Sequence, residues 1–175
     1  MHALRTLTLV AAGLLSLAVA SPAPAADSGM VQRIKVMDDC DPASFNAAIG
    51  PGICVGDGDV TFDRFVEELP EGGHGHWKFA PEDTRIDHGG VLELVNTGGE
   101  PHTFTEVEEF GPGCVPEINE LMGLDGAPVM DCDAAFADLL FPGAREDVRG
   151  LSAGKHKFEC ALHPWMIAVV TVRQR

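Results

Sequence analysis

The chain has 175 residues, with 27 acidic and 12 basic side chains and a formal net charge of −15. Such an acidic surface repels nucleic acid and anionic lipid, so neither is expected as a partner. The excess acid favours encounter with a basic protein, although keeping the protein soluble is an equally simple role for it.

Residues 1–26 have the pattern of a secretory signal peptide. His2 and Arg5 form a short polar start, 7–20 is an apolar run, and small residues follow it. The run is shorter than the ~20 residues that a membrane helix needs, and an uncleaved anchor is the alternative interpretation. We therefore expect a periplasmic or secreted protein with no membrane span in the mature chain.

Residues 27–76 predict an N-terminal extension with short helices. A strand is expected over 31–37. Asp41 and Pro42 are typical of a helix N-cap and first helical position. Apolar residues recur at helical spacing over 60–69, which predicts an amphipathic helix there.

Residues 77–175 predict an all-β domain, a Greek-key β-sandwich, because short β-rich runs alternate with glycine turns. The expected strands are 77–79, 84–87, 91–95, 103–107, 156–160 and 167–172. A segment over 110–144 interrupts this pattern as an insertion that contains two cysteines. Short helices are expected within it, near 116–122 and 133–140.

The chain has five cysteines, and export to an oxidising compartment favours disulfides. Four cysteines can pair in three ways. We favour Cys40–Cys54 and Cys114–Cys132, because each pair closes a short local loop. Cys160 is then left over, and it has metal-binding neighbours.

Cys160, His163 and Met166 follow one another at intervals of three residues. Thiolate and thioether are soft ligands and imidazole is intermediate, and two histidines, a cysteine and a weak axial methionine form an electron-transfer copper site. His102 is the best second histidine, because it follows the strand over 91–95 and the turn over 96–101. The alternatives are a buried free cysteine without metal and a surface-loop histidine.

The Cys-x-x-His-x-x-Met loop, with His102 upstream in GGEPHTF, resembles the cupredoxins, the plastocyanin- and amicyanin-like type 1 blue copper proteins. The resemblance covers about 77–172, less 110–144. It implies one copper ion with His102, Cys160 and His163 in the plane, Met166 as axial ligand, and His163 at the surface. Members of the family often have Asn after the first histidine. Here it is Thr103, whose hydroxyl can make a similar hydrogen bond.

The sequence thus predicts an exported carrier of single electrons and not an enzyme. Its partner would be a redox protein, such as a basic cytochrome or a membrane or periplasmic oxidoreductase. A copper delivery or sequestration protein is the main alternative, followed by an oxidase or nitrite reductase and a structural zinc site. His74 and His76 are a weak second metal site, for which a solvated Gly-rich turn is the preferred interpretation.

Overall fold

The computed structural model describes residues 31–174. The signal peptide predicted over 1–26 lies outside the described residues. Within 31–174, no helix has both the length and the apolar character that crossing a membrane requires.

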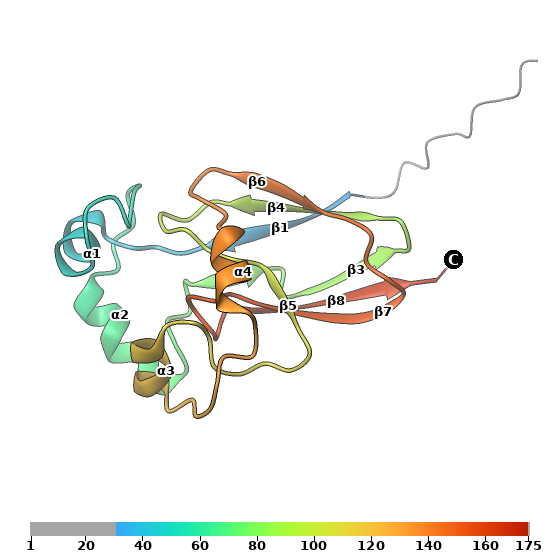
Figure 1. Ribbon diagram of the computed structural model, residues 1–175. Helices are drawn as coiled ribbons and strands as arrows, with labels where there is room; N and C mark the ends of the chain where they lie inside the picture. The colour runs from blue at the N-terminus through green and yellow to red at the C-terminus, as the bar shows by residue number, and fades with distance from the viewer. Residues whose placement is uncertain (1–30, 175) are drawn as a thin grey trace, which may run out of the picture.

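Two four-stranded sheets face each other and form a β-sandwich (Figure 1). One sheet has the order β2 (Lys78–Ala80), β1 (Val31–Met37), β4 (Val91–Asn96), β6 (Arg145–Val148). The other has the order β3 (Asp83–Asp87), β8 (Ile167–Arg173), β7 (Gly154–Glu159), β5 (Thr105–Val107). The β1–β4 and β3–β8 pairs are parallel and the others are antiparallel. The predicted all-β sandwich is confirmed.

The burial of each strand reflects its place in the sandwich. β8 alternates between buried and partly exposed positions, as expected of a strand with one face on the core. β4 is buried at nearly every position, because it lies between β1 and β6. β1 belongs to the predicted N-terminal extension but pairs with β4 from Val31↔Val91 to Val36↔Asn96. The extension therefore supplies an internal strand of the sandwich.

β6 was not predicted from the sequence. Its residues Arg145–Val148 are exposed or partly exposed and show no apolar alternation. It forms the edge of its sheet, where its only described strand partner is β4. An exposed edge strand of charged residues carries no hydrophobic period, so the sequence pattern could not reveal it.

Two short helices of the extension, α1 (Pro42–Ala48) and α2 (Phe62–Glu68), lie at one end of the sandwich beside α3 (Pro116–Met122) (Figure 1). The Asp41 carboxylate caps α1 by accepting from the backbone of Ala43 and Ser44, as predicted. Thr61 caps α2, so this helix begins two residues later than the predicted 60–69. A 3-10 turn, η1 (Leu69–Glu71), continues it.

The insertion contains α3 and α4 (Cys132–Ala137). α3 has the predicted bounds, whereas α4 ends before the predicted residue 140. The reason is that Leu140 pairs with His102 in an isolated antiparallel bridge, which requires extended backbone there. The chain between α4 and β6 thereby contacts the turn that carries His102.

Both expected disulfides, Cys40–Cys54 and Cys114–Cys132, are present, and Cys160 is a free, buried cysteine. The first links the segment after β1 to the loop before α2. The second links the start of the insertion to α4. Each holds a long irregular segment at the end of the sandwich where the helices lie, which reduces the conformational freedom of that end.

Candidate metal centre

The loop between β7 and β8 presents Cys160, His163 and Met166. Its backbone is closed by two hydrogen bonds: Cys160 N donates to Met166 O at 3.0 Å, and Met166 N donates to His163 O at 2.8 Å. Cys160 and Met166 are fully buried and His163 is 4% exposed. The loop is therefore a compact turn that directs its donor side chains into the protein.

His102 comes from the turn after β4 and is fully buried. Its backbone exchanges two hydrogen bonds with Leu140, at 3.2 and 2.7 Å. The side-chain amide of Asn96 donates to the carbonyls of Glu100 and Leu140, both at 2.8 Å. The turn is thus fixed against the segment that precedes β6.

These two segments bring His102, Cys160 and His163 together. The Sγ atom of Cys160 lies 3.8 Å from Nδ1 of His102 and 3.7 Å from Nδ1 of His163. Around one ion, a sulfur at ~2.3 Å and a nitrogen at ~2.0 Å in a trigonal plane are roughly 3.7 Å apart. The three donor atoms therefore have the spacing of ligands to one metal ion.

Met166 lies at the end of the same loop, fully buried in the hydrophobic core. Its backbone hydrogen bonds to Cys160 and His163 hold its main chain next to theirs. Its role as the fourth, axial ligand stays a prediction.

The electrostatics of the cluster favour a thiolate. Burial alone would raise the pKa of Cys160, but hydrogen bonds and charge from His102 and His163 lower this pKa well below its usual value. Thr103 N also donates to the Cys160 sulfur at 3.5 Å. Thiolate is the form of cysteine that binds metals.

Thr103 also braces this loop, by the hydrogen bond that the family resemblance implied. Its hydroxyl accepts a hydrogen bond from Ala161 N at 2.8 Å. Because Ala161 directly follows Cys160 and is fully buried, this bond ties the loop to the turn that carries His102.

The expectation that His163 lies at the surface is wrong for this structure. Its ring is covered by aromatic side chains at centroid distances of 6.1 Å for Phe65, 6.5 Å for Trp77 and 5.3 Å for Trp165. Phe65 comes from α2, so the extension covers this side of the site. Single-sequence reasoning could not foresee it, because α2 lies almost a hundred residues before the loop.

Two buried carboxylates near the histidines were also missed. Asp38 Oδ2 lies 2.8 Å from Nε2 of His102. Glu100 accepts a hydrogen bond from Trp77 Nε1 at 2.6 Å and lies 3.7 Å from Nε2 of His163. Burial raises the pKa of Glu100. In the sequence, Asp38 belongs to an acidic run and carries no sign of burial.

The donor set fits copper. One thiolate, two imidazoles and a neighbouring thioether are the ligands of electron-transfer copper sites, whereas magnesium and calcium prefer oxygen. The donors come from two separate turns of the sandwich, and backbone hydrogen bonds hold both turns. His102, Cys160 and His163 would hold the ion, with Met166 beside them.

His74 and His76 do not form a comparable site. His76 Nδ1 pairs with Asp39 at 2.9 Å, and His76 N donates to Nδ1 of His74 at 3.2 Å. Among residues 31–174, they belong to no group of three close metal-ligating side chains. The preferred interpretation of this segment as a solvated Gly-rich turn holds for His76, whose side chain is 57% exposed, and is wrong for His74, which is buried.

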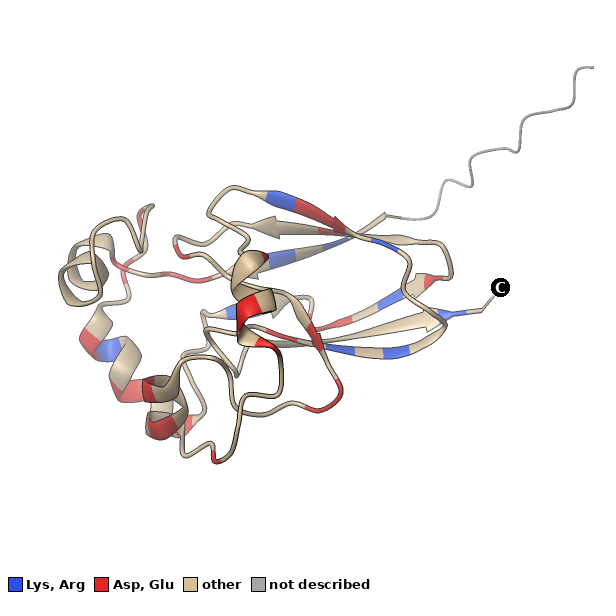
Figure 2. Cartoon of the chain, viewed as in Figure 1, with Lys and Arg blue, Asp and Glu red and all other residues tan. Residues whose placement is uncertain are grey.

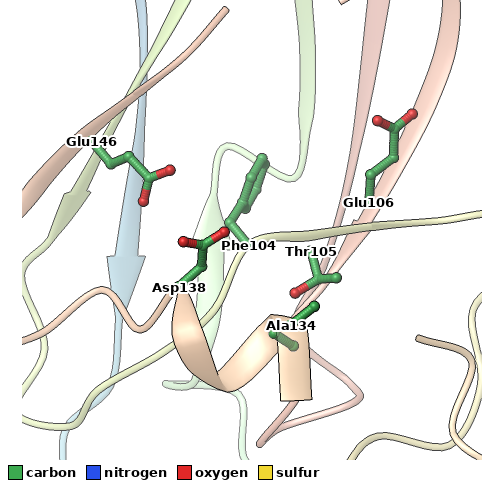
Figure 3. Close-up of a pocket in the computed structure, with 7 residues that line it drawn as sticks. Phe104, Thr105, Glu106, Ala134, Asp138 and Glu146 are labelled. Atoms are coloured by element: carbon green, nitrogen blue, oxygen red, sulfur yellow. The ribbon is translucent and has the colours of Figure 1, made fainter. Parts of the chain in front are cut away.

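A hollow of about 190 Å³ lies beside α4, away from the metal donors. Figure 3 shows Asp138 and Glu146 turned toward it, with Phe104 between them and Glu106. Partial burial, followed by the charge of Asp138, raises the pKa of Glu146. The hollow contains no soft ligand and contributes nothing to the metal centre.

No family model matches this chain and no curated protein does either. Among solved structures it is similar to a purple cupredoxin from Nitrosopumilus maritimus, at 18% identity and a TM-score of 0.43, over 81% of this chain and 99% of that one. A plastocyanin from Dryopteris crassirhizoma has 18% identity and a TM-score of 0.40 over the same shares. A copper-containing nitrite reductase from Thermus scotoductus has 19% identity and a TM-score of 0.37, over 56% of this chain and 20% of that one.

Proposed function

We propose that this chain is an exported type 1 copper protein that carries single electrons between redox partners. The observation that carries the proposal is the position of the buried Cys160 sulfur, 3.7 and 3.8 Å from the Nδ1 atoms of two buried histidines. Copper bound there would supply reversible one-electron chemistry.

The protein's own contribution is to hold the ligand side chains rigidly and to shield them from water. A carrier exchanges electrons quickly when its ligands move little between the two oxidation states. The Cys160–Met166 backbone bond and the Thr103 brace hold one turn, and the Leu140 bridge holds the other. Buried donors on fixed turns support electron transfer over copper delivery, which requires ready release of the metal.

Electrons would enter and leave through the helical end of the sandwich. A hollow of about 570 Å³ extends between α1, α2 and α3 to the ring of His163. Its lining is mostly apolar and includes Phe62, Phe65, Val115, Leu121 and Leu162. The ring of His163 lines this hollow, so a partner seated there would contact the ring directly.

The acidic charge at the helical end of the sandwich favours a basic partner. Figure 2 marks acidic residue positions on α2 and α3, whereas Lys and Arg positions lie mainly on the strands. Arg64 is the only Lys or Arg within 38–71 and 106–138. We propose a basic redox protein, such as a cytochrome or a periplasmic or membrane oxidoreductase, that inserts an apolar projection into the hollow.

The two disulfides support an exported, periplasmic or secreted location, because structural disulfides persist in oxidising compartments. The signal pattern over 1–26 points the same way. N-terminal sequencing of the protein recovered from the periplasm or medium would test it, with a start after residue 20 or 25 expected.

A visible absorption spectrum tests the copper site. Purified mature protein with one equivalent of Cu(II) is expected to show an intense blue band from the thiolate. The band should bleach with a mild reductant and return with an oxidant. Cys160→Ser should abolish it while the far-UV circular dichroism stays unchanged, because the core and both disulfides remain.

Other outcomes separate the alternatives. A copper adduct that cannot be cycled would contradict the electron carrier, and rapid copper loss to a competing chelator would favour delivery. Turnover of oxygen or nitrite by the isolated protein would show an enzyme. In Met166→Leu, a copper potential should shift, whereas affinity at a structural zinc site should scarcely change.

A further inference from the structure

Asp38 lies directly after β1, on the far side of His102 from Cys160. Nδ1 of His102 faces the cysteine sulfur, and its Nε2 donates to Asp38 Oδ2 at 2.8 Å. The side chains of both residues are fully buried. The imidazole therefore stands between the metal donors and a carboxylate that water does not reach.

The protein builds a dedicated cradle for this carboxylate. Asp38 accepts backbone hydrogen bonds from Gly99 at 2.8 Å, Glu100 at 3.0 Å and Cys40 at 3.3 Å. These donors stabilise the ionised form.

The glycines of the GGE segment are required by the cradle. A Cβ atom on Gly98 would lie 1.9 Å from Asp38 Oδ2, and one on Gly99 would lie 2.2 Å from the carbonyl oxygen of Val55. No side chain fits at either position. The segment next to His102 thus wraps the carboxylate with bare backbone, and the Cys40–Cys54 disulfide fixes the strand end that carries Asp38.

We propose that Asp38 is a positioning residue of the metal centre, which locks His102 with Nδ1 toward the metal and lowers the reduction potential through its fixed negative charge. This inference rests on the proposed function. A carboxylate on the outer nitrogen of a ligand histidine fixes the tautomer and the ring and makes the ligand more basic. A more basic ligand and a nearby anion both favour Cu(II) over Cu(I).

His163 offers an internal comparison. Its Nε2 lies 3.7 Å from Glu100, beyond hydrogen-bond distance, and Glu100 instead accepts from Trp77. The two ligand histidines are therefore held differently. His102 has a direct charged acceptor and His163 has a more distant one.

The test compares the copper reduction potential of Asp38→Asn with that of wild type. Asn keeps the shape and an oxygen acceptor but removes the charge. We expect the ratio of reduced to oxidised protein at a fixed applied potential to rise at least tenfold, a shift of about 59 mV for a one-electron couple. The blue band should persist, because Asp38 is not a ligand.

Asp39→Asn is the matched control. It removes the same charge one residue away, from a carboxylate that is 35% exposed and pairs with His76. Solvent and salt screen that charge. The reduction potential of Asp39→Asn should therefore shift by less than a third of the shift in Asp38→Asn. Equal shifts in reduction potential in the two variants would overturn the proposal, because the loss of one negative charge anywhere nearby would then explain both.

A second measurement applies if Asp38→Asn does not fold. In wild-type protein loaded with Cu(I), nitrogen-resolved NMR should show the Nε2 proton of His102 further downfield and slower to exchange than that of His163. The opposite order would overturn the proposal. A wild-type protein that binds no redox-active copper overturns the proposed function itself, whereas reversible copper with an unshifted Asp38→Asn overturns only the role of Asp38.

Discussion

Thr103 shows how one hydroxyl joins the two turns of the metal centre. It follows His102 directly, and its Oγ1 accepts from Ala161 N next to Cys160. Its own backbone N donates to the Cys160 sulfur. A single residue therefore restrains the loop and stabilises the thiolate, and the backbone part of this role does not depend on the side chain.

Thr103→Val should destabilise the protein by about 1–3 kcal/mol, because it leaves the buried N–H of Ala161 without an acceptor. Copper should also dissociate faster from the loosened loop. Chemical denaturation and transfer of copper to a chelator measure the two effects. Thr103→Ser keeps the hydroxyl and should retain most of the wild-type stability and copper retention. If Thr103→Ser loses as much of both as Thr103→Val, the hydroxyl does not brace the loop.

At the scale of elements, α2 covers His163, which the family resemblance implied would be exposed. Phe65 packs on Trp77 with centroids 4.9 Å apart and edge-on to His163 at 6.1 Å. The helix is short, and its stability derives from this packing and from the Thr61 cap. The extension therefore covers the ring of His163.

Phe65→Ala should cost about 3–5 kcal/mol in the free energy of unfolding and open the cover over His163. Electron exchange with a small inorganic redox complex should then become faster, as stopped-flow bleaching of the blue band would measure. Phe141→Ala is the control, because Phe141 is 60% exposed and its loss should change stability by less than about 0.5 kcal/mol. An unchanged exchange rate in Phe65→Ala would show that α2 does not limit access.

A charged pair links β5 to β7. His156 Nδ1 lies 2.6 Å from Glu106 Oε1, and its Nε2 donates to the carbonyl of Ser152 at 2.8 Å. The hydrogen bond to Glu106 raises the pKa of His156 above its usual value, against a smaller effect of burial. A raised histidine pKa stabilises the fold below the unfolded pKa of about 6.5, and the gain is lost as pH rises through the folded pKa.

Glu106→Gln should therefore lower the free energy of unfolding more at pH 5.5 than at pH 9. The difference at the lower pH should reach at most ~1 kcal/mol, because Glu106 is half-exposed and the pair is screened by solvent. Denaturation curves at the two pH values measure it. Glu108→Gln removes a neighbouring exposed charge and should show no such pH dependence. A loss of unfolding free energy in Glu106→Gln that increases with pH would contradict a stabilising His156–Glu106 pair.

At the scale of the whole molecule, charge is distributed unevenly. The helices at the end that covers the candidate metal centre carry acidic residues, and most basic residues lie on the strands (Figure 2). Acidic residues on α2 and α3, with Glu117 in the lining, therefore place negative charge beside the hollow that leads to His163. Such a field speeds encounter with a basic partner more than it strengthens the final complex.

Electron transfer to a basic redox protein should accordingly slow by about tenfold or more between 10 and 150 mM salt, as the screening length falls from ~30 to ~8 Å. Stopped-flow rates measure this directly. Glu117→Gln with Glu120→Gln on α3 should flatten the salt dependence, whereas Glu82→Gln, between β2 and β3, should leave it unchanged. An acidic partner that reacts faster at low salt would contradict the acidic docking surface.

The sequence by itself determined the local parts of this protein. Cys160, His163 and Met166 lie within seven residues, so their spacing alone predicts one ligand loop, and the disulfides close loops of 14 and 18 residues. Strands with an apolar period and helices with a clear cap were predicted close to their observed bounds. These features depend on neighbouring residues, whose chemistry is visible in a single chain.

Only the tertiary structure decided the surroundings of the site. Asp38 is 64 residues from His102, and Trp165 is 91 residues from the carbonyl of His74 to which it donates. Whether an acidic residue is solvated or buried against a ligand depends on the packing of distant segments. β6, the cover over His163 and the cradle of Asp38 all arise from such contacts, and no local period or spacing encodes them.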